Sequence, residues 1–207
     1  MNIIKRFFNN TRKPEGILGR IIAVSMNLGH SSVSKWGIRH IENIQAERII
    51  DLGCGGGKNV NRLLKKFPCA KVAGLDYSDI SVKKTSKLNK KEIRKGRCRV
   101  VKAGVDNIPF KSDTFDLAAA FETVYFWPGP VKSFMEVNRI LKENGVFMIV
   151  NESDGKGKYD EKWSRYIDGL HIYSEKQLAD YLKEAGFREV ISSHEIDKHR
   201  ICIIAKK

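Results

Sequence analysis

The stretch "IIDLGCGGGKN", residues Ile49 to Asn59, places a glycine-rich turn directly behind a short apolar run. Glycine-rich turns between a strand and a helix let a ligand lie against bare backbone. Nucleoside triphosphates, dinucleotides and nucleosides without phosphates all use such turns. Each of the three ligands requires a different pattern of residues around the glycines.

The two phosphate-bearing ligands fit this turn poorly. A P-loop follows GxxxxGK[ST], but Asn59 replaces the Ser or Thr that holds magnesium, and Leu52 stands where the first glycine belongs. The dinucleotide pattern GxGxxG places its third glycine at Lys58, whose side chain would crowd the contact between helix and strand. The sequence therefore argues against a P-loop and disfavours a dinucleotide.

A nucleoside with an amino-acid half suits the neighbouring carboxylates. Asp76 ends the next apolar run, in "VAGLDYS", 25 residues after Asp51. A carboxylate at the end of the second strand can accept hydrogen bonds from both ribose hydroxyls. Asp51, just before the glycines, can hold an ammonium group directly or through water.

Short apolar runs alternate with longer amphipathic ones from residue 46 onward, which is typical of parallel βαβ units in an open sheet covered on both faces. The last two runs are too close together for a crossover helix, so we expect an antiparallel hairpin. Ser174 is the expected N-cap of the last helix and Gly186 its stop. The expected strands are 47–52, 71–76, 97–103, 116–122, 145–151, 189–195 and 200–206, and the expected helices are 57–67, 79–94, 130–142 and 174–185.

Residues 1–45 precede this pattern and contain two helix-like segments, 17–30 and 31–44. In the second segment the apolar positions recur at helical spacing. We expect residues 1–45 to form a helical cap over the ligand-binding edge of the sheet, and residues 46–207 to form the ligand-binding domain.

The composition, 42% hydrophobic and 30% charged, is that of a soluble globular protein. No apolar run approaches the roughly 18 residues that a membrane span needs, and the N-terminus does not resemble a signal peptide. The four cysteines are scattered without a CxxC pair, which argues against a zinc site and suggests reduced thiols and a cytoplasmic location. We expect no metal site.

The formal net charge of +14 is concentrated in one stretch. Ten Lys or Arg and one acid lie between Lys83 and Lys102. A solvated basic helix face explains this pattern, and a contact with RNA or an anionic surface is the open alternative. Nothing aromatic is interleaved there to stack on bases.

Four segments together resemble the successive motifs of the class I S-adenosylmethionine-dependent methyltransferases: "IIDLGCGGG", "VAGLDYS", "VDNIPFKSDTFDLAAAFET" and "VNRILKENGVFMIVNE". They cover about residues 46–155 in the right order and resemble the small-molecule branch called a methyltransferase domain. The resemblance implies a Rossmann-like α/β fold with a seven-stranded sheet of order 3-2-1-4-5-7-6, strand 7 antiparallel. It also implies S-adenosyl-L-methionine as cofactor and S-adenosyl-L-homocysteine as product.

The resemblance also implies a set of cofactor-binding residues, with one departure from the pattern. Related sequences carry an acidic residue in "GDAxxLPF", where this chain has "AGVDNIPF". Gly104 takes the acidic position, and we expect Asp106 to substitute for it from two residues along. The expected cofactor-binding residues are Asp51, Gly53, Gly55, Gly57, Asp76, Tyr77, Val105, Asp106 and Phe121.

Methyl transfer from a sulfonium is an in-line displacement, and a base is needed only if the acceptor arrives protonated. The catalytic candidates are Glu122, His30 and Tyr125. Each has a structural alternative: Glu122 could hold a backbone amide, His30 could cap a helix, and the aromatic run after the fourth strand could be ordinary packing. Asp154 and Glu152 are expected to be solvated loop acids. The expected acceptor pocket comprises Asn27, Tyr125, Trp127, Glu152 and His171.

Methylation of a small molecule at O, N or S is the leading functional hypothesis. The [ND]PP[YFW] tetrapeptide of nucleic-acid amino-group methyltransferases is absent, because "ETVY" stands there, and no Pro-Cys dipeptide supports a C5 mechanism on pyrimidines. An RNA or protein methyltransferase using the basic stretch, and a non-catalytic cofactor-binding subunit, remain alternatives. The acceptor and the oligomeric state stay open.

Overall fold

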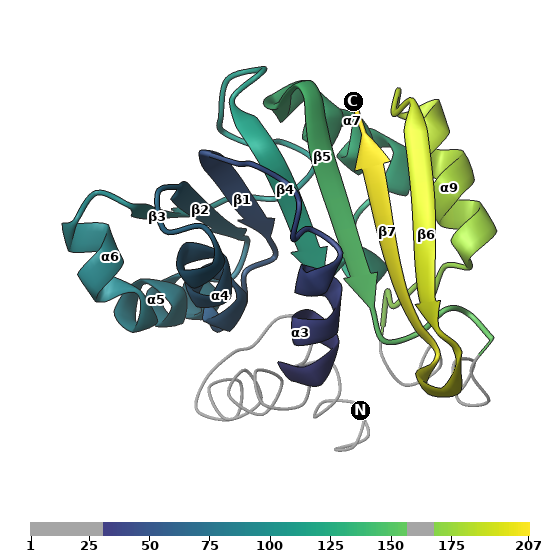
Figure 1. The fold of residues 1–207 in the computed structure, drawn as a ribbon, viewed down its shortest axis with the longest axis horizontal. Helices are drawn as coiled ribbons and strands as arrows, with labels where there is room; N and C mark the ends of the chain where they lie inside the picture. The colour runs from purple at the N-terminus through teal and green to yellow at the C-terminus, as the bar shows by residue number, and fades with distance from the viewer. Residues whose placement is uncertain (1–30, 157–167) are drawn as a thin grey trace.

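A seven-stranded sheet of order β3-β2-β1-β4-β5-β7-β6 organises the computed structural model, which describes residues 31–156 and 168–207 (Figure 1). The strands β1 to β5 run parallel, and β7 pairs antiparallel with both β5 and β6. This confirms the expected sheet order and the terminal hairpin. The strands are β1 (Arg48–Leu52), β2 (Lys71–Asp76), β3 (Cys98–Lys102), β4 (Phe115–Phe121), β5 (Leu141–Asn151), β6 (Glu189–Glu195) and β7 (Arg200–Lys206).

Helices cover both faces of the sheet, as the alternating pattern predicts. One face carries α3 (Ser31–Arg39), α4 (Lys58–Lys66) and α5 (Asp79–Leu88), and the other carries α7 (Pro130–Ile140) and α9 (Glu175–Glu184) (Figure 1). A short α6 (Lys90–Arg94) follows α5. Ser174 caps α9 in a capping box with Gln177, and Gly186 follows it with φ +92°. None of the described helices is long and apolar enough to cross a membrane.

Two of the expected helices are shorter than the sequence expectation, and β5 begins at Leu141 rather than at residue 145. The helix expected over 79–94 is interrupted at Asn89, whose buried amide donates to the carbonyls of Gly57 and Thr85. The helix expected over 130–142 ends at Ile140, because Leu141 already pairs with Phe115 in the sheet. In both cases a contact with a distant segment overrides the local helical pattern.

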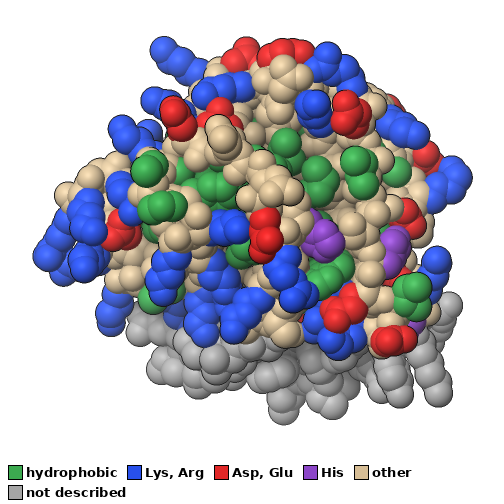
Figure 2. All heavy atoms as spheres, viewed as in Figure 1, with side chains coloured by type: hydrophobic (Ala, Val, Ile, Leu, Met, Phe, Trp, Pro, Cys, Tyr) green, Lys and Arg blue, Asp and Glu red, His purple; other side chains and the backbone are tan. Residues whose placement is uncertain are grey.

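Charge is unevenly distributed over the surface. Figure 2 shows Lys and Arg side chains gathered over α4, α5 and α6, at the left of the view, with few Asp or Glu among them. The basic stretch noted in the sequence therefore forms part of a larger continuous basic region.

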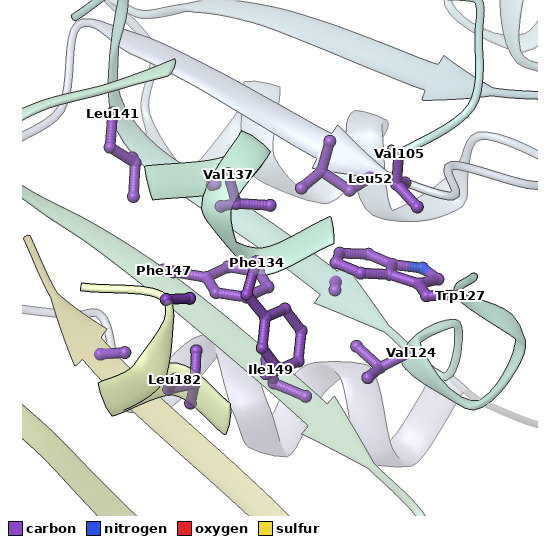
Figure 3. Close-up of a cluster of buried hydrophobic side chains, with 14 of the residues drawn as sticks. Leu52, Val105, Val124, Trp127, Phe134, Val137, Leu141, Phe147, Ile149 and Leu182 are labelled. Carbon is purple, nitrogen blue, oxygen red and sulfur yellow. The ribbon is translucent and has the colours of Figure 1, made fainter. Parts of the chain in front are cut away.

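Aromatic side chains fill the core beneath α7 and α9 (Figure 3). The ring of Trp127 stacks on Phe147 with centroids 6.0 Å apart, and Phe134 contacts both rings at 5.8 Å. All three side chains are at most 5% exposed. This packing fixes the loop after β4 against β5, so the chain that follows β4 has a rigid base.

The helix α3 packs closely on the opposite face. A Cβ added at Gly37 would lie 2.4 Å from Cγ2 of Val150, so only glycine permits this approach of α3 to β5. Ser32 accepts a hydrogen bond from Arg200 at the start of β7. The expected cap over the edge of the sheet remains a prediction, because residues 1–30 lie outside the described residues.

Candidate active site

The glycine turn between β1 and α4 depends on glycine at two positions. Gly53 has φ +78° and Gly57 has φ +83°, in the left-handed region that side chains disfavour. A Cβ on Gly53 would meet Oγ1 of Thr123 at 2.4 Å, and one on Gly57 would meet Cα of Thr85 at 2.7 Å. The turn is therefore enclosed at these two points by the chain after β4 and by α5.

Hydrogen bonds from both sides hold the turn. The amides of Gly53 and Cys54 donate to the carbonyl of Leu75 at 2.8 and 2.9 Å. On the other side, the Thr85 hydroxyl donates to the carbonyl of Gly55, and Asn89 donates to Gly57. Sequence reasoning missed Thr85 and Asn89. Their signal was the four-residue spacing of polar residues, which places Thr85 on the buried face of α5 and Asn89, the residue after its end, on the same side.

Gly55 differs from Gly53 and Gly57 because, among residues 31–156 and 168–207, nothing crowds the space beside it. The nearest atom to an added Cβ is the carbonyl oxygen of Gly53 at 3.9 Å. The backbone of Gly55 has φ +52°, and its amide donates to Oδ2 of Asp76 at 2.9 Å. A ligand can therefore approach the main chain at this point.

Asp51 is a buried carboxylate at the end of β1 with an unsatisfied oxygen. It is 1% exposed, and its Oδ2 has no hydrogen-bond partner among the described residues. Burial, and then the negative charge of Asp76, raise the pKa of Asp51 to about 8, against the opposing effect of Arg62. A buried polar atom without a partner costs about 1–3 kcal/mol. A cationic donor would relieve that cost.

Asp76, at the end of β2, is also buried, but its oxygens are used. Oδ1 accepts from the Ser78 amide and Oδ2 from the Gly55 amide, both at 2.9 Å. Burial raises the pKa of Asp76, and these two amides oppose the rise. Each carboxylate oxygen can accept a second hydrogen bond, so ribose hydroxyls can still bind. Tyr77, which follows, is 42% exposed.

In the segment after β3, the carboxylate of Asp106 lies beside Gly104, the residue at the position where the resemblance leads one to expect an acid. A Cβ on Gly104 would lie only 2.5 Å from Oδ1 of Asp106, so this carboxylate occupies the space that a side chain at 104 would take. Val105 is 8% exposed and packs in the core under α7. The arrangement supports the proposed substitution of Asp106 for the missing acid.

The end of β4 adopts an unusual backbone conformation. Phe121 is the last strand residue and is buried, whereas Glu122 has φ +59° and donates its amide to the carbonyl of Val150. Oε1 of Glu122 accepts the amide of Glu152, which is the structural alternative considered for this residue. Strained positions of this kind often occur at functional sites.

The aromatic residues after β4 occupy different environments. The Tyr125 hydroxyl accepts the amide of Ser153 at 3.0 Å, and its carbonyl accepts the amide of His171 at 2.9 Å. Tyr125 and His171 thus lie beside the loop after β5. The Trp127 ring packs in the core, and its Nε1 donates to Oγ1 of Thr123 at 2.6 Å. Ordinary packing therefore accounts for Trp127, and only its indole N–H edge points toward the glycine turn.

Of the two acids in the loop after β5, Asp154 is buried and paired, whereas the side chain of Glu152 is 40% exposed. Asp154 is 7% exposed and accepts the amide of Lys156, with Nδ1 of His199 at 3.4 Å. The expectation of a solvated Asp154 is therefore wrong, because the β6–β7 turn folds over it. Glu152 lies 3.4 Å from the guanidinium of Arg200.

Asn151 is a buried polar residue that sequence reasoning missed. It ends β5 with no exposed surface, and neither its amide nitrogen nor its amide oxygen has a hydrogen-bond partner among the described residues. The predicted Asn27 and His30 lie outside the described residues. Within residues 31–156 and 168–207, no group of three His, Cys, Asp or Glu could hold a metal ion.

Comparisons with known proteins find a matching family and several similar sequences. A family described as a methyltransferase domain matches residues 50–149. Cycloartenol-C-24-methyltransferase 1 of Oryza sativa subsp. japonica is 33% identical over 155 residues, which is 70% of this chain and 44% of that protein. The 2-methyl-6-phytyl-1,4-hydroquinone methyltransferase 2 of the same plant is 26% identical over 146 residues, 69% of this chain and 39% of that protein. The chain thus spans less than half the length of these relatives.

A solved structure has a similar fold. The phosphoethanolamine N-methyltransferase 2 of Haemonchus contortus, bound to phosphomonomethylethanolamine and S-adenosylhomocysteine, superposes with a TM-score of 0.79 at 14% identity. The match covers 100% of this chain and 60% of that one. The residues of this chain fit the cofactor, because the orphaned Oδ2 of Asp51 and the open backbone at Gly55 suit an ammonium-bearing ligand.

The pKa of Asp51 predicts a pH-dependent cofactor affinity. An ammonium group favours the ionised carboxylate, so below pH 8 binding must first release a proton from Asp51. We expect the affinity for S-adenosyl-L-methionine at pH 6.5 to be about tenfold or more below that at pH 8.5, since each pH unit below the pKa costs up to about tenfold. Isothermal titration calorimetry in buffers of different ionisation enthalpy measures both the affinity and the proton released. The control is Asp51→Asn, which cannot titrate; equal pH slopes for both proteins would contradict the assignment.

The position of Asp106 predicts that substitutions at 106 and 104 weaken cofactor binding, whereas a substitution at 107 does not. Asp106→Ala should weaken cofactor binding about five- to tenfold, the loss of one hydrogen bond, and Gly104→Ala should act similarly by displacing the carboxylate. Asn107→Ala is the matched control, because Asn107 is exposed. Calorimetric affinities that are the same for Asp106→Ala and Asn107→Ala would refute the substitution.

Proposed function

Because the chain belongs to the class I S-adenosylmethionine-dependent methyltransferases, we propose that it transfers a methyl group from S-adenosyl-L-methionine to O, N or S of a small-molecule acceptor. The observation that carries the proposal is a pair of buried carboxylates at the ends of β1 and β2: Asp51 has an oxygen without a partner among the described residues, and Asp76 accepts the amide of Gly55, whose backbone is open. That arrangement suits one adenosyl ligand with an amino-acid half.

In this proposal the protein binds the cofactor and the acceptor and orients them for methyl transfer. When bound, the cofactor supplies an electrophilic methyl group on a sulfonium. Asp51 would hold the ammonium, the Gly55 backbone would lie against the amino-acid half, and Asp76 would accept the ribose hydroxyls. Asp106 would face the adenine from the segment after β3. Fixing both reactants in line accounts for most of what such a site contributes to the rate.

The acceptor side is bounded by the loops after β4 and β5. Two hydrogen bonds join these loops: the Glu152 amide donates to the Glu122 carboxylate, and the Ser153 amide donates to the Tyr125 hydroxyl. The two plant relatives are named for a sterol and for a phytyl-substituted hydroquinone. These names support an acceptor with a large apolar part, and the buried Tyr125 is consistent with that class.

Two other functions compete with this proposal. An RNA or protein methyltransferase would use the basic stretch, and a non-catalytic subunit would bind the cofactor without turnover. The relatives named above are methyltransferases of small molecules, which favours the proposal over both. The cytoplasmic location expected from the cysteines stays a prediction.

The test is a transfer assay with S-adenosyl-L-methionine labelled in its methyl group. Extract of the source organism is separated into apolar metabolites, polar metabolites, RNA and protein, and each fraction is incubated with the enzyme. We expect label in an apolar metabolite. Label confined to RNA or protein would contradict the proposal, and cofactor binding with no labelled fraction would favour the non-catalytic alternative.

Once an acceptor is known, its chemistry tests the predicted base. If the acceptor arrives protonated, Glu122→Gln or His30→Ala should lower kcat about 100-fold or more, the usual contribution of a general base. Lys65→Gln, which alters an exposed residue of α4, is a control. Turnover that stays within about threefold for both variants would show that neither residue is the base.

A further inference from the structure

Most of the net charge lies in one part of the molecule. Residues 58–102, which we call the basic lobe, contain 15 Lys or Arg and three Asp or Glu, and so contribute +12 of the formal +14. The lobe comprises α4, β2, α5, α6 and β3 at one end of the sheet (Figures 1 and 2). The rest of the chain is nearly neutral, so the molecule carries a strong positive field at one end.

The basic side chains of α5 and α6 point outward and are largely unpaired. Ser81, Thr85 and Asn89 form the buried side of this segment. The exposed side carries Lys83, Lys87, Lys90, Lys91 and Arg94. Among the described residues none of these five forms an ion pair, whereas Glu92 pairs with Lys95 and Arg97, and Asp79 with Lys102. The outward face therefore keeps its charge available for a partner.

An exposed apolar residue neighbours these lysines in the sequence. Leu88, at the end of α5, is 49% exposed, with Lys87 before it and Lys90 and Lys91 shortly after. Lysines around an exposed leucine match a lipid bilayer surface, where headgroups meet the charge and the interface buries the apolar side chain. A phosphodiester backbone offers no comparable place for a leucine.

We propose that the basic lobe binds the surface of a bilayer containing anionic phospholipid, through the outward face of α5 and α6. Residues 78–109 contain no Phe, Tyr or Trp, so this face lacks the aromatic platforms that stack on bases of single-stranded nucleic acid. The proposal stands independently of the proposed methyl transfer. If both hold, the lobe brings the enzyme to the phase in which an apolar acceptor dissolves.

Sedimentation with vesicles tests the proposal. The full chain is mixed with vesicles of phosphatidylcholine alone, or with about one third phosphatidylglycerol, at 0.1 M salt. We expect at least about tenfold stronger partition onto the anionic vesicles, and release at 0.5 M salt because screening shortens the reach of the field. Equal partition onto both vesicle types, or no binding to either, would overturn the proposal.

Two triple variants with the same net charge test whether the basic lobe makes the contact with the vesicles. Lys83→Glu/Lys87→Glu/Lys91→Glu should weaken anionic binding at least about tenfold. The matched control, Lys111→Glu/Lys132→Glu/Lys183→Glu, alters exposed lysines outside the lobe and should change it less than threefold. Leu88→Gln should weaken binding about twofold or more without changing the charge. Thermal denaturation and cofactor affinity, expected to be unchanged in all three, show that the variants are folded.

RNA is the alternative partner for the basic lobe, and its affinity is measured at the same salt concentration. Single-stranded and double-stranded RNA are titrated against the wild type and both triple variants. Binding to RNA that is tighter than to the anionic vesicles, and lost in the lobe variant alone, would overturn the lipid assignment. Equal losses of vesicle binding in both triple variants would show that net charge, and not this face, is responsible.

Discussion

The amides of Gly53 and Cys54 donate to the carbonyl of Leu75, and the rest of the site depends on this link between the first two strands. It holds the glycine turn over the end of β2, so that the Gly55 amide reaches Asp76. Asp76, which we propose binds the ribose, thus also fixes the backbone of Gly55, which we propose lies against the amino-acid half of the cofactor. Both parts of the ligand site are set by one short hydrogen-bonded unit, which explains how so few residues can define it.

Helix α5 connects the two surfaces for which we propose functions. Its buried side, through Thr85 and the following Asn89, holds the glycine turn, while its outward side carries the lysines of the basic lobe. Substitutions on the outward side leave these buried contacts intact. Membrane association and cofactor binding can therefore be separated by mutation, although one helix serves both.

The sequence predicts those features that depend on local spacing or on a resemblance. The glycine turn, Asp76, the capping of α9 and the sheet order belong to this group. The features it missed depend on contacts between distant segments. Asn89 breaks a helix because its amide reaches the glycine turn, and Asp154 is buried because the β6–β7 turn covers it. In the sequence, Trp127 cannot be distinguished from the adjacent aromatic residues Tyr125 and Phe126, but its ring packs on Phe147 in the core. No local pattern reveals which of several adjacent aromatic residues turns inward.

The central claim is that Asp51, the glycine turn and Asp76 together hold one adenosyl ligand that carries an ammonium group and no phosphate. Differential scanning fluorimetry of the purified chain with four compounds tests it most directly: S-adenosyl-L-methionine, S-adenosyl-L-homocysteine, a nicotinamide dinucleotide and a nucleoside triphosphate. Ligands that bind only the folded state raise the melting temperature, so the account predicts a rise of several degrees with the first two and none with the others. A shift with either phosphate-bearing compound, and none with the adenosyl amino acids, would contradict it.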